Sequence, residues 1–396
     1  MMTKYDTALY APLLWTGESD EVLRDVTLIC ERGLLVDIVA GRSRGATDSG
    51  NAAIIPPLVN AHCHLEFSQL KQPFRTNRPF SNWIGQTMQA RRENVDAASS
   101  IRAGIEESAE AGVGFLADVK TQSTDCYPEA EEAGPEVILF QEVIGLTDEA
   151  VASQRELISS FLQEVGRFRL GLSPHAPFTV RPDLLEFCVE KSREAELPLM
   201  MHLAETKAEL ELLAEGTGEL VDMLSQFGMW SAGMYPAGTR PLDILTMLAK
   251  APRVLLAHGN YLDEQEIQFL ADHPQMHIVY CPRTHHYFEH SQHPWQSMLE
   301  AGVNVALGTD GRGSNPDLSI WNEVRFLKQQ FPDVEPRRLL KMATINGAKS
   351  LGMDTTIQIG RPANWTMLIQ KNSEAKPMTS LQNLLQAEVW AHGDQN

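Results

Sequence analysis

Five separated residues carry side chains that bind divalent cations, and each stands at the end of an apolar run. They are His62, His64, His202, His258 and Asp310. The first two lie two positions apart in NAHCHLEF, so on a strand both imidazoles point to one face. Neutral imidazoles with one carboxylate and an open position suit a catalytic Zn²⁺ better than a closed structural site. The alternative is a set of unrelated histidines buried at strand ends.

Eight apolar runs separated by long amphipathic stretches follow Pro56, and this alternation predicts a parallel α/β fold. The runs are LVNAHCH, GVGFLADV, EVILFQEVIG, FRLGLSPH, PLMMHLA, RVLLAHG, MHIVYCP and NVALGTD. A parallel barrel gathers the carboxyl ends of its strands on one face, where its loops build the site. The five candidate ligands are therefore expected to meet there. The segment EGTGELVDMLSQFGMWSAGMYPAGTRP, after the fifth run, is either a lid or substrate loop or an ordinary surface loop.

The chain divides into three segments by pattern. Residues 1–55 contain short β-rich runs around Gly and Asp, residues 56–353 hold the strand and helix alternation, and residues 354–396 return to short strands. A length of 396 residues with 43% hydrophobic content suits a barrel of about 250 residues plus a smaller domain.

Charge and cysteine usage exclude several classes of partner and compartment. The net charge is −19, from 33 basic and 52 acidic residues, so the summed field argues against binding to nucleic acid or an anionic membrane. The five cysteines are scattered and form no CxxC pair, which indicates a reducing cytoplasm. No signal peptide or long apolar span is evident, so we expect a cytoplasmic protein.

The motifs in their order resemble the amidohydrolase superfamily, in its branch of mononuclear deaminases. The matching segments are NAHCHLEFS, SPHAPFTV, MHLAETKAE, LLAHGNYLD and LGTDGRGSNPDLS. The resemblance implies a (β/α)₈ TIM-like barrel with a small β-sandwich domain formed from both termini. It also assigns one divalent cation to His62, His64, His202 and Asp310, with Zn²⁺ expected and Fe²⁺ or Mn²⁺ as alternatives. His258 becomes a neighbour of the attacking water or a further ligand.

Glu205 is the candidate proton shuttle. Water on Zn²⁺ has a pKa of about 7, so hydroxide is available for attack on an electron-poor carbon. Glu205 lies three residues past His202, just beyond the strand end, and the resemblance implies that it passes a proton to a ring nitrogen. Asp310 would accept the second proton. A glutamate that merely caps a helix start in ETKAE is the alternative for Glu205.

Four further residues are candidates for contact with the substrate. By resemblance, His175 in SPHAPFTV and Trp83 in FSNWIGQ lie beside the ligand; capping of a turn and ordinary packing are their alternatives. In CPRTHHYFEHSQHPW the chain departs from relatives that carry Cys-Pro-x-Ser-Asn. We interpret this segment as a substrate-contacting loop in which Arg283 or His285 meets a polar or anionic tail, in preference to a second metal site.

The leading hypothesis is a metal-dependent hydrolytic deaminase of an aminated purine, purine nucleoside or similar heterocycle. The alternatives are hydrolysis of another C–N or C–Cl bond, and a non-catalytic metal-binding barrel protein. The substrate is a small molecule in either enzyme hypothesis. A homodimer is expected from the resemblance alone.

Overall fold

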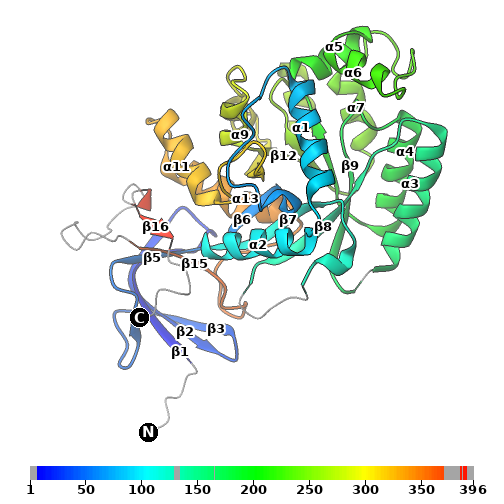
Figure 1. Ribbon diagram of the computed structural model, residues 1–396. Helices are drawn as coiled ribbons and strands as arrows, with labels where there is room; N and C mark the ends of the chain where they lie inside the picture. Colours follow the sequence, from blue (N-terminus) through cyan, green and yellow to red (C-terminus); the bar gives the residue numbers. More distant parts are fainter. Residues whose placement is uncertain (1–6, 129–133, 165, 370–383, 386, 390–396) are drawn as a thin grey trace.

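The fold is organised by two β-sheets of very different size (Figure 1). The computed structural model describes residues 7–128, 134–164, 166–369, 384–385 and 387–389. The larger sheet lies among helices, and the smaller one projects to one side near the N-terminus.

The larger sheet is parallel, and it curls until its first and last strands lie side by side. Its strand order is β13-β12-β11-β10-β9-β8-β7-β6-β14. β13 is followed within a few residues by β14, which pairs with β6, so Asp310 lies opposite Cys63. The bounds are β6 (Leu58–His64), β7 (Val113–Lys120), β8 (Glu136–Val143), β9 (Arg169–Pro174), β10 (Leu199–Leu203), β11 (Val254–His258), β12 (Met276–Tyr280), β13 (Asn304–Leu307) and β14 (Asp310–Gly311). All eight predicted runs are confirmed as strands.

Gly308 permits the close approach of the last strand to the first. A Cβ atom at this position would lie 2.9 Å from both the carbonyl oxygen and the Cβ atom of His62. Thr309 donates its backbone N–H to that same carbonyl at 3.1 Å. The glycine of the GTDG motif is therefore required for β14 to reach β6 and bring Asp310 beside His62.

Helices follow most strands and lie outside the curled sheet (Figure 1). Their bounds are α1 (Phe80–Glu93), α2 (Ala97–Glu110), α3 (Asp148–Phe161), α4 (Pro182–Ala195), α5 (Lys207–Glu215), α6 (Glu219–Gln226), α7 (Pro241–Leu248), α8 (Glu264–Ala271), α9 (Pro282–Tyr287), α10 (Trp295–Glu300), α11 (Ile320–Gln330), α12 (Pro336–Ala343) and α13 (Ile345–Ser350). Short 3₁₀ turns cover Leu65–Phe67, Thr124–Cys126 and Leu162–Glu164.

The smaller sheet combines strands from both ends of the chain. Its order is β16-β15-β5-β1-β2-β3, with β4 paired to β1. The bounds are β1 (Thr7–Trp15), β2 (Val22–Glu31), β3 (Leu34–Ala40), β4 (Thr47–Asp48), β5 (Ala52–Ile55), β15 (Thr366–Ile369) and β16 (Glu388–Val389). The described strands form a single sheet, so the predicted two-layer sandwich is not confirmed. Part of residues 354–396, in which further strands were expected, lies outside the described residues.

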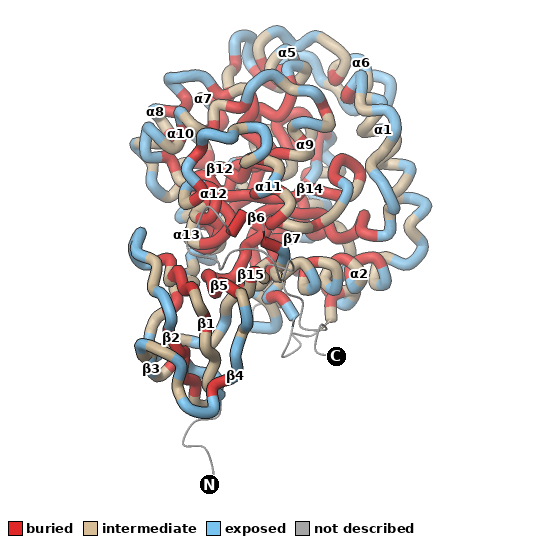
Figure 2. The backbone as a smooth tube through the Cα atoms, turned by 90° about the vertical axis from the view of Figure 1, so that its left-hand side faces the viewer, coloured by how far each residue is buried: buried red, intermediate tan, exposed pale blue. Residues whose placement is uncertain are grey.

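Buried residues concentrate in the strands of the larger sheet, which explains why these strands are continuous apolar runs (Figure 2). Every residue of β6, β10, β11 and β12 is buried. A parallel sheet covered by helices buries both of its faces, so apolar side chains fill the strands until a polar residue ends each one. Among the described residues, none of the helices is long and apolar enough to cross a bilayer.

Candidate metal centre and active-site cavity

Four of the predicted residues come together at the carboxyl ends of four strands. His62, His202, His258 and Asp310 each offer one ligand atom, and these atoms lie within 4.8 Å of one another. His64, from the same strand as His62, places its Nε2 3.4 Å from Asp310 Oδ1. All five side chains are buried. Within the described part of the chain this is the one such group, and the histidine-rich segment after β12 does not form another.

Hydrogen bonds leave imidazole nitrogens of this cluster free to bind a cation. His202 Nδ1 lies 2.9 Å from the carbonyl oxygen of His175, so it carries the proton and leaves Nε2 with a lone pair. His62 Nδ1 faces Met200 Sδ at 3.1 Å, and its buried Nε2 has no hydrogen-bond partner. A buried nitrogen without a partner is costly unless something occupies its lone pair. The donor set therefore fits one divalent cation.

Asp310 is held so that one oxygen faces the imidazoles. Its Oδ2 accepts a hydrogen bond from Ser314 Oγ at 2.6 Å, while Oδ1 lies 3.5 Å from His62 Nε2. Burial alone would raise the pKa of this carboxyl, but the neighbouring imidazoles of His62, His64 and His258 hold it below its ordinary value. Asp310 is thus an ionised acceptor at neutral pH. Sequence reasoning missed Ser314, although it stands four residues after Asp310 in the same motif.

Burial also favours the neutral form of three of these imidazoles. It lowers the pKa of His202 and His64 well below the ordinary value, and it lowers the pKa of His258 to about 3. Neutral imidazole is the form that binds a metal.

Glu205 lies beside this cluster with its carboxyl group out of solvent. Its Oε1 is 3.7 Å from His258 Nε2, and burial, followed by the charges of Asp310 and Glu209, raises the pKa of this carboxyl well above its ordinary value. Both causes favour the protonated form of this carboxyl, which is the form that can donate a proton. The helix-capping alternative does not describe Glu205, since the cap of α5 is Thr206, whose side chain accepts from the N–H of Glu209.

The backbone around Glu205 is fixed by a second buried glutamate that sequence reasoning missed. Glu209 accepts the N–H of Ala204 at 2.8 Å and the N–H of Glu205 at 3.0 Å. Ala204, His258 and Asp310 all have positive φ, at 52°, 70° and 57°. Left-handed conformations at non-glycine residues are unfavourable and persist where the surroundings enforce them, commonly at functional sites.

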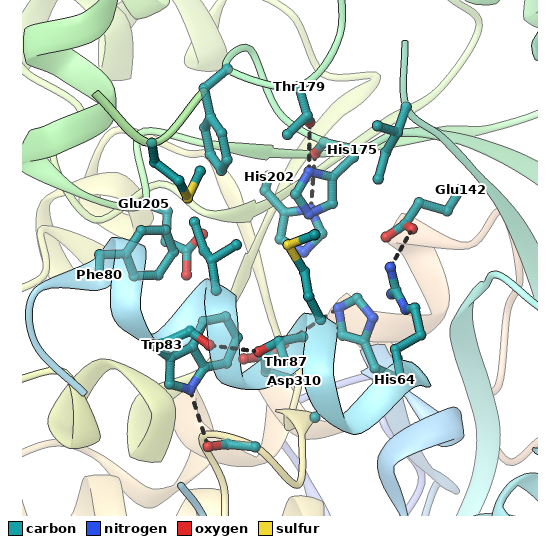
Figure 3. Close-up of a pocket in the computed structure, with 18 of the residues that line it drawn as sticks. His64, Phe80, Trp83, Thr87, Glu142, His175, Thr179, His202, Glu205 and Asp310 are labelled. Carbon is teal, nitrogen blue, oxygen red and sulfur yellow. Dashed lines mark hydrogen bonds and ion pairs between the residues drawn. The ribbon is translucent and has the colours of Figure 1, made fainter. Parts of the chain in front are cut away.

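The cluster opens into a cavity of about 250 Å³ (Figure 3). His64, His202, His258, Glu205 and Asp310 line its inner end. Trp83 lies on its wall, stacked on Phe80 with ring centroids 5.6 Å apart, and donates its indole N–H to the carbonyl of Gly313. His175 also lines the cavity, with Nδ1 2.7 Å from Thr179 Oγ1. Trp83 and His175 therefore lie where a bound ligand would contact them.

Two further charged residues line the cavity and were not predicted. Glu142, near the end of β8, pairs with Arg91 of α1 at 3.3 Å, and Arg91 also binds Glu66 at 2.6 Å. Burial is the main cause that raises the pKa of Glu142 to about 7. Its place at a strand end, in FQEV, is the same signal that identified the histidines.

Arg283 and His285 do not line this cavity. Arg283 lies outside it because its guanidinium binds Asp317 at 2.6 Å and the fully buried Glu323 at 2.7 Å. These ion pairs use the donors that a substrate tail would need, so the arrangement argues against the predicted contact. His285 packs instead among His290, His293 and Tyr280, where burial lowers its pKa to about 4.

Comparison with known proteins supports the same class of site. The family model for the amidohydrolase family matches residues 53–393. The aminodeoxyfutalosine deaminase of Deinococcus radiodurans is 31% identical over 324 residues, which cover 78% of this chain and 75% of the relative. A 5-methylthioadenosine/S-adenosylhomocysteine deaminase of Halobacterium salinarum is 30% identical over 336 residues, with 80% and 73% coverage.

The fold agrees with a solved structure as well. Helicobacter pylori aminofutalosine deaminase, in complex with methylthio-coformycin, superposes with a TM-score of 0.81 at 19% identity over 97% of each chain. The resemblance to deaminases of this kind is thus confirmed. Because the family model spans residues 53–393 of the 396, this protein is a member of the amidohydrolase family.

Proposed function

We propose that this protein is a metal-dependent hydrolytic deaminase of an aminated purine, a purine nucleoside or a similar heterocycle. The observation that carries the proposal is the juxtaposition of the His and Asp cluster with the buried carboxyl of Glu205, at the closed end of an aromatic cavity. The two sequence relatives described above are named as deaminases, which supports the same reaction class.

In this proposal His62, His64, His202 and Asp310 hold one divalent cation, with His258 as a neighbour or further ligand. We propose Zn²⁺, because histidine nitrogens with one carboxylate suit it; Fe²⁺ and Mn²⁺ accept the same donors. When bound, such a cation lowers the pKa of water and polarises the reacting centre.

The remaining roles belong to side chains of the chain itself. Glu205 holds a proton on its carboxyl group and delivers it to a ring nitrogen as the carbon that bears the amino group is attacked. Asp310, ionised at neutral pH, accepts a proton from the attacking water and passes it to the amino group. The C–N bond then breaks and ammonia leaves, while the proton of the added hydroxyl returns to the Glu205 carboxylate as the carbonyl forms. His258 orients that water, and Trp83 and His175 contact the substrate, with the indole ring against a flat heterocycle. Water is excluded by the apolar walls of the cavity.

The proposal also covers the domain boundaries of the protein, its oligomeric state and its location in the cell. We propose a full (β/α)₈ barrel over residues 56–353, with residues 1–55 and 354–396 forming the small β domain as a sandwich. Support comes from the hydrogen bonds of Thr366 Oγ1, which accepts from Leu58 N–H and donates to the Gly112 carbonyl, joining the two sheets. We also propose a cytoplasmic protein that forms homodimers and does not bind nucleic acid or membranes.

The test is ammonia release from a panel of amines by protein of measured metal content. The panel contains adenosine, methylthioadenosine, S-adenosylhomocysteine, aminodeoxyfutalosine, guanine and a pterin. We expect release from at least one nucleoside. Absence of ammonia from every member, with a stoichiometric divalent cation bound, would refute the assignment and favour either another C–N or C–Cl substrate or a non-catalytic barrel.

A further inference from the structure

The outer half of the cavity is built almost wholly from apolar side chains. One wall is the inner face of α1, with Phe80, Trp83, Ile84 and Met88. The opposite wall comes from α6 and the residues after it, namely Met223, Leu224, Phe227 and Met229. A substrate bound with its amino group at the metal cluster would extend its substituent between these two walls.

Three apolar residues that line the cavity are also exposed to solvent, and they mark its mouth. Ile144, Phe227 and Met229 are 36%, 49% and 42% exposed, and all three line the cavity. The exposed large hydrophobic side chains in the described part of the chain number seven, so nearly half of them gather at this one opening. Exposed apolar side chains at the opening of a cavity are typical of a surface that a ligand covers.

The charged residues that line the cavity offer no free cation to an anionic ligand. Among the described residues that line it, Arg91 is the one cation of Lys or Arg type, and Glu66 and Glu142 already bind its guanidinium. The remaining charged lining residues are the carboxyl groups of Glu142, Glu205 and Asp310. A carboxylate on the substrate would therefore find no free cation and would lose its hydration against apolar walls.

The two walls are tied to each other, so the mouth is a built feature. Ser81, in the first turn of α1, donates both its backbone N–H and its hydroxyl to Glu219 Oε2 at 3.0 and 2.8 Å. Glu219 is the first residue of α6. This link fixes the separation of the helices across which a substituent must fit.

We propose that Ile144, Phe227 and Met229 determine which substrate substituent the cavity accepts. The cavity selects aminated heterocycles that carry an uncharged, apolar substituent, such as a thioether. It disfavours those that carry a carboxylate or a zwitterionic amino acid. This inference rests on the proposed deaminase function. Apolar contacts of this size discriminate between ligands by roughly 10-fold or more.

The test compares kcat/KM for methylthioadenosine with that for S-adenosylhomocysteine, which has a charged amino acid on the same sulfur. We expect a preference of at least about 10-fold for the uncharged thioether. The double variant Phe227→Ser/Met229→Ser should lower kcat/KM for methylthioadenosine by about 10-fold, a larger loss than for adenosine, which lacks the thioether. Leu157→Ser, at a 38% exposed leucine of α3 outside the cavity, is the matched control and should change neither.

A second variant tests charge directly. Phe227→Lys supplies the missing cation at the mouth, so the ratio of the two kcat/KM values should move toward S-adenosylhomocysteine. Inhibition constants of the two deaminated products should follow the same order, which reports binding apart from turnover. Equal values for the two substrates, or a wild-type preference for the zwitterion, would overturn this inference while leaving the deaminase function intact. Failure of both substrates and all other amines would instead refute the proposed function.

Discussion

Two buried glutamates four residues apart should respond in opposite ways to the same substitution. The carboxyl group of Glu205 lies beside His258 and makes no hydrogen bond to the backbone of the described residues. In contrast, both carboxyl oxygens of Glu209 accept backbone N–H groups. Replacement by Gln substitutes an amide that cannot titrate for each carboxyl group and changes the shape of the side chain little. The pair therefore separates a chemical role from a structural one.

For Glu205→Gln we expect kcat for ammonia release to fall by about 10²- to 10⁴-fold, the usual contribution of a positioned acid or base. Folding should not suffer. Burial and the charges of Asp310 and Glu209 raise the pKa of Glu205, so the ionised form is disfavoured and a neutral amide relieves that cost. Thermal unfolding should occur at the wild-type temperature or above it, with the cation still bound.

For Glu209→Gln we expect the opposite result, a clear loss of stability with a smaller loss of turnover. A Gln side chain offers one acceptor oxygen where Glu209 satisfies two N–H groups, at 2.8 and 3.0 Å, so one buried donor loses its partner. That costs about 1–3 kcal/mol of stability, and the loss of turnover should be smaller than for Glu205→Gln. Steady-state ammonia assays, thermal melts and metal analysis of the two variants provide the comparison. If Glu205→Gln keeps more than a tenth of wild-type turnover with metal bound, the assigned proton transfer is wrong.

Three further substitutions test other parts of the account. Arg283→Met should destabilise the protein by about 3–5 kcal/mol, because the fully buried Glu323 loses its ion pair. KM should change little, since Arg283 does not line the cavity. A large rise in KM with normal stability would instead show that Arg283 contacts the substrate. Ser314→Ala should weaken metal affinity by about 10- to 100-fold through loss of the 2.6 Å hydrogen bond to Asp310, measured by competition with a chelator, and unchanged affinity would count against that positioning role. His277→Leu should reduce the acid sensitivity of folding. Burial lowers the pKa of His277 from 6.5 to about 3, so the unfolded chain takes up the proton first, and this residue's contribution is lost as pH falls from 6.5 toward 3. Between pH 7.5 and 5 the variant should lose about 2 kcal/mol less than wild type in denaturant titrations, and parallel losses would contradict the sign.

The strands and the cation-binding cluster were predictable because their signals are local. A strand covered on both faces must be apolar along its length, and a polar residue such as His202 or His258 at its end has few structural uses. The run LVNAHCH coincides with β6 (Leu58–His64), and the other seven runs agree with their strands to within a few residues.

Helix breaks and partners distant in the sequence were harder to predict from the sequence. The amphipathic stretch over residues 82–112 shows no obvious break in its pattern, yet it forms two helices, α1 and α2. Asp96 begins the second helix by accepting the N–H of Ser99. Arg283 was assigned to the substrate because its ion-pair partners lie 34 and 40 residues further along the chain, at Asp317 and Glu323. Nothing in the local pattern marks such a pairing.

Arg91 and Glu142 illustrate the same limit inside the cavity. Glu142 carries the strand-end signal, but Arg91 has the pattern of an ordinary charged residue of a helix, and only the fold brings the two to 3.3 Å at the cavity wall. Their contact depends on how α1 crosses the ends of β6 and β8, which no local pattern specifies.

The most direct test of the central claim is to measure metal content and ammonia release on the same preparations. The purified protein should hold one divalent cation per chain, and turnover should fall to background on chelation and return in proportion to the Zn²⁺ restored. His202→Ala should lose both the cation and turnover. Full turnover in protein stripped of divalent cations, or a tightly bound cation that survives loss of His202 and Asp310, would contradict the account.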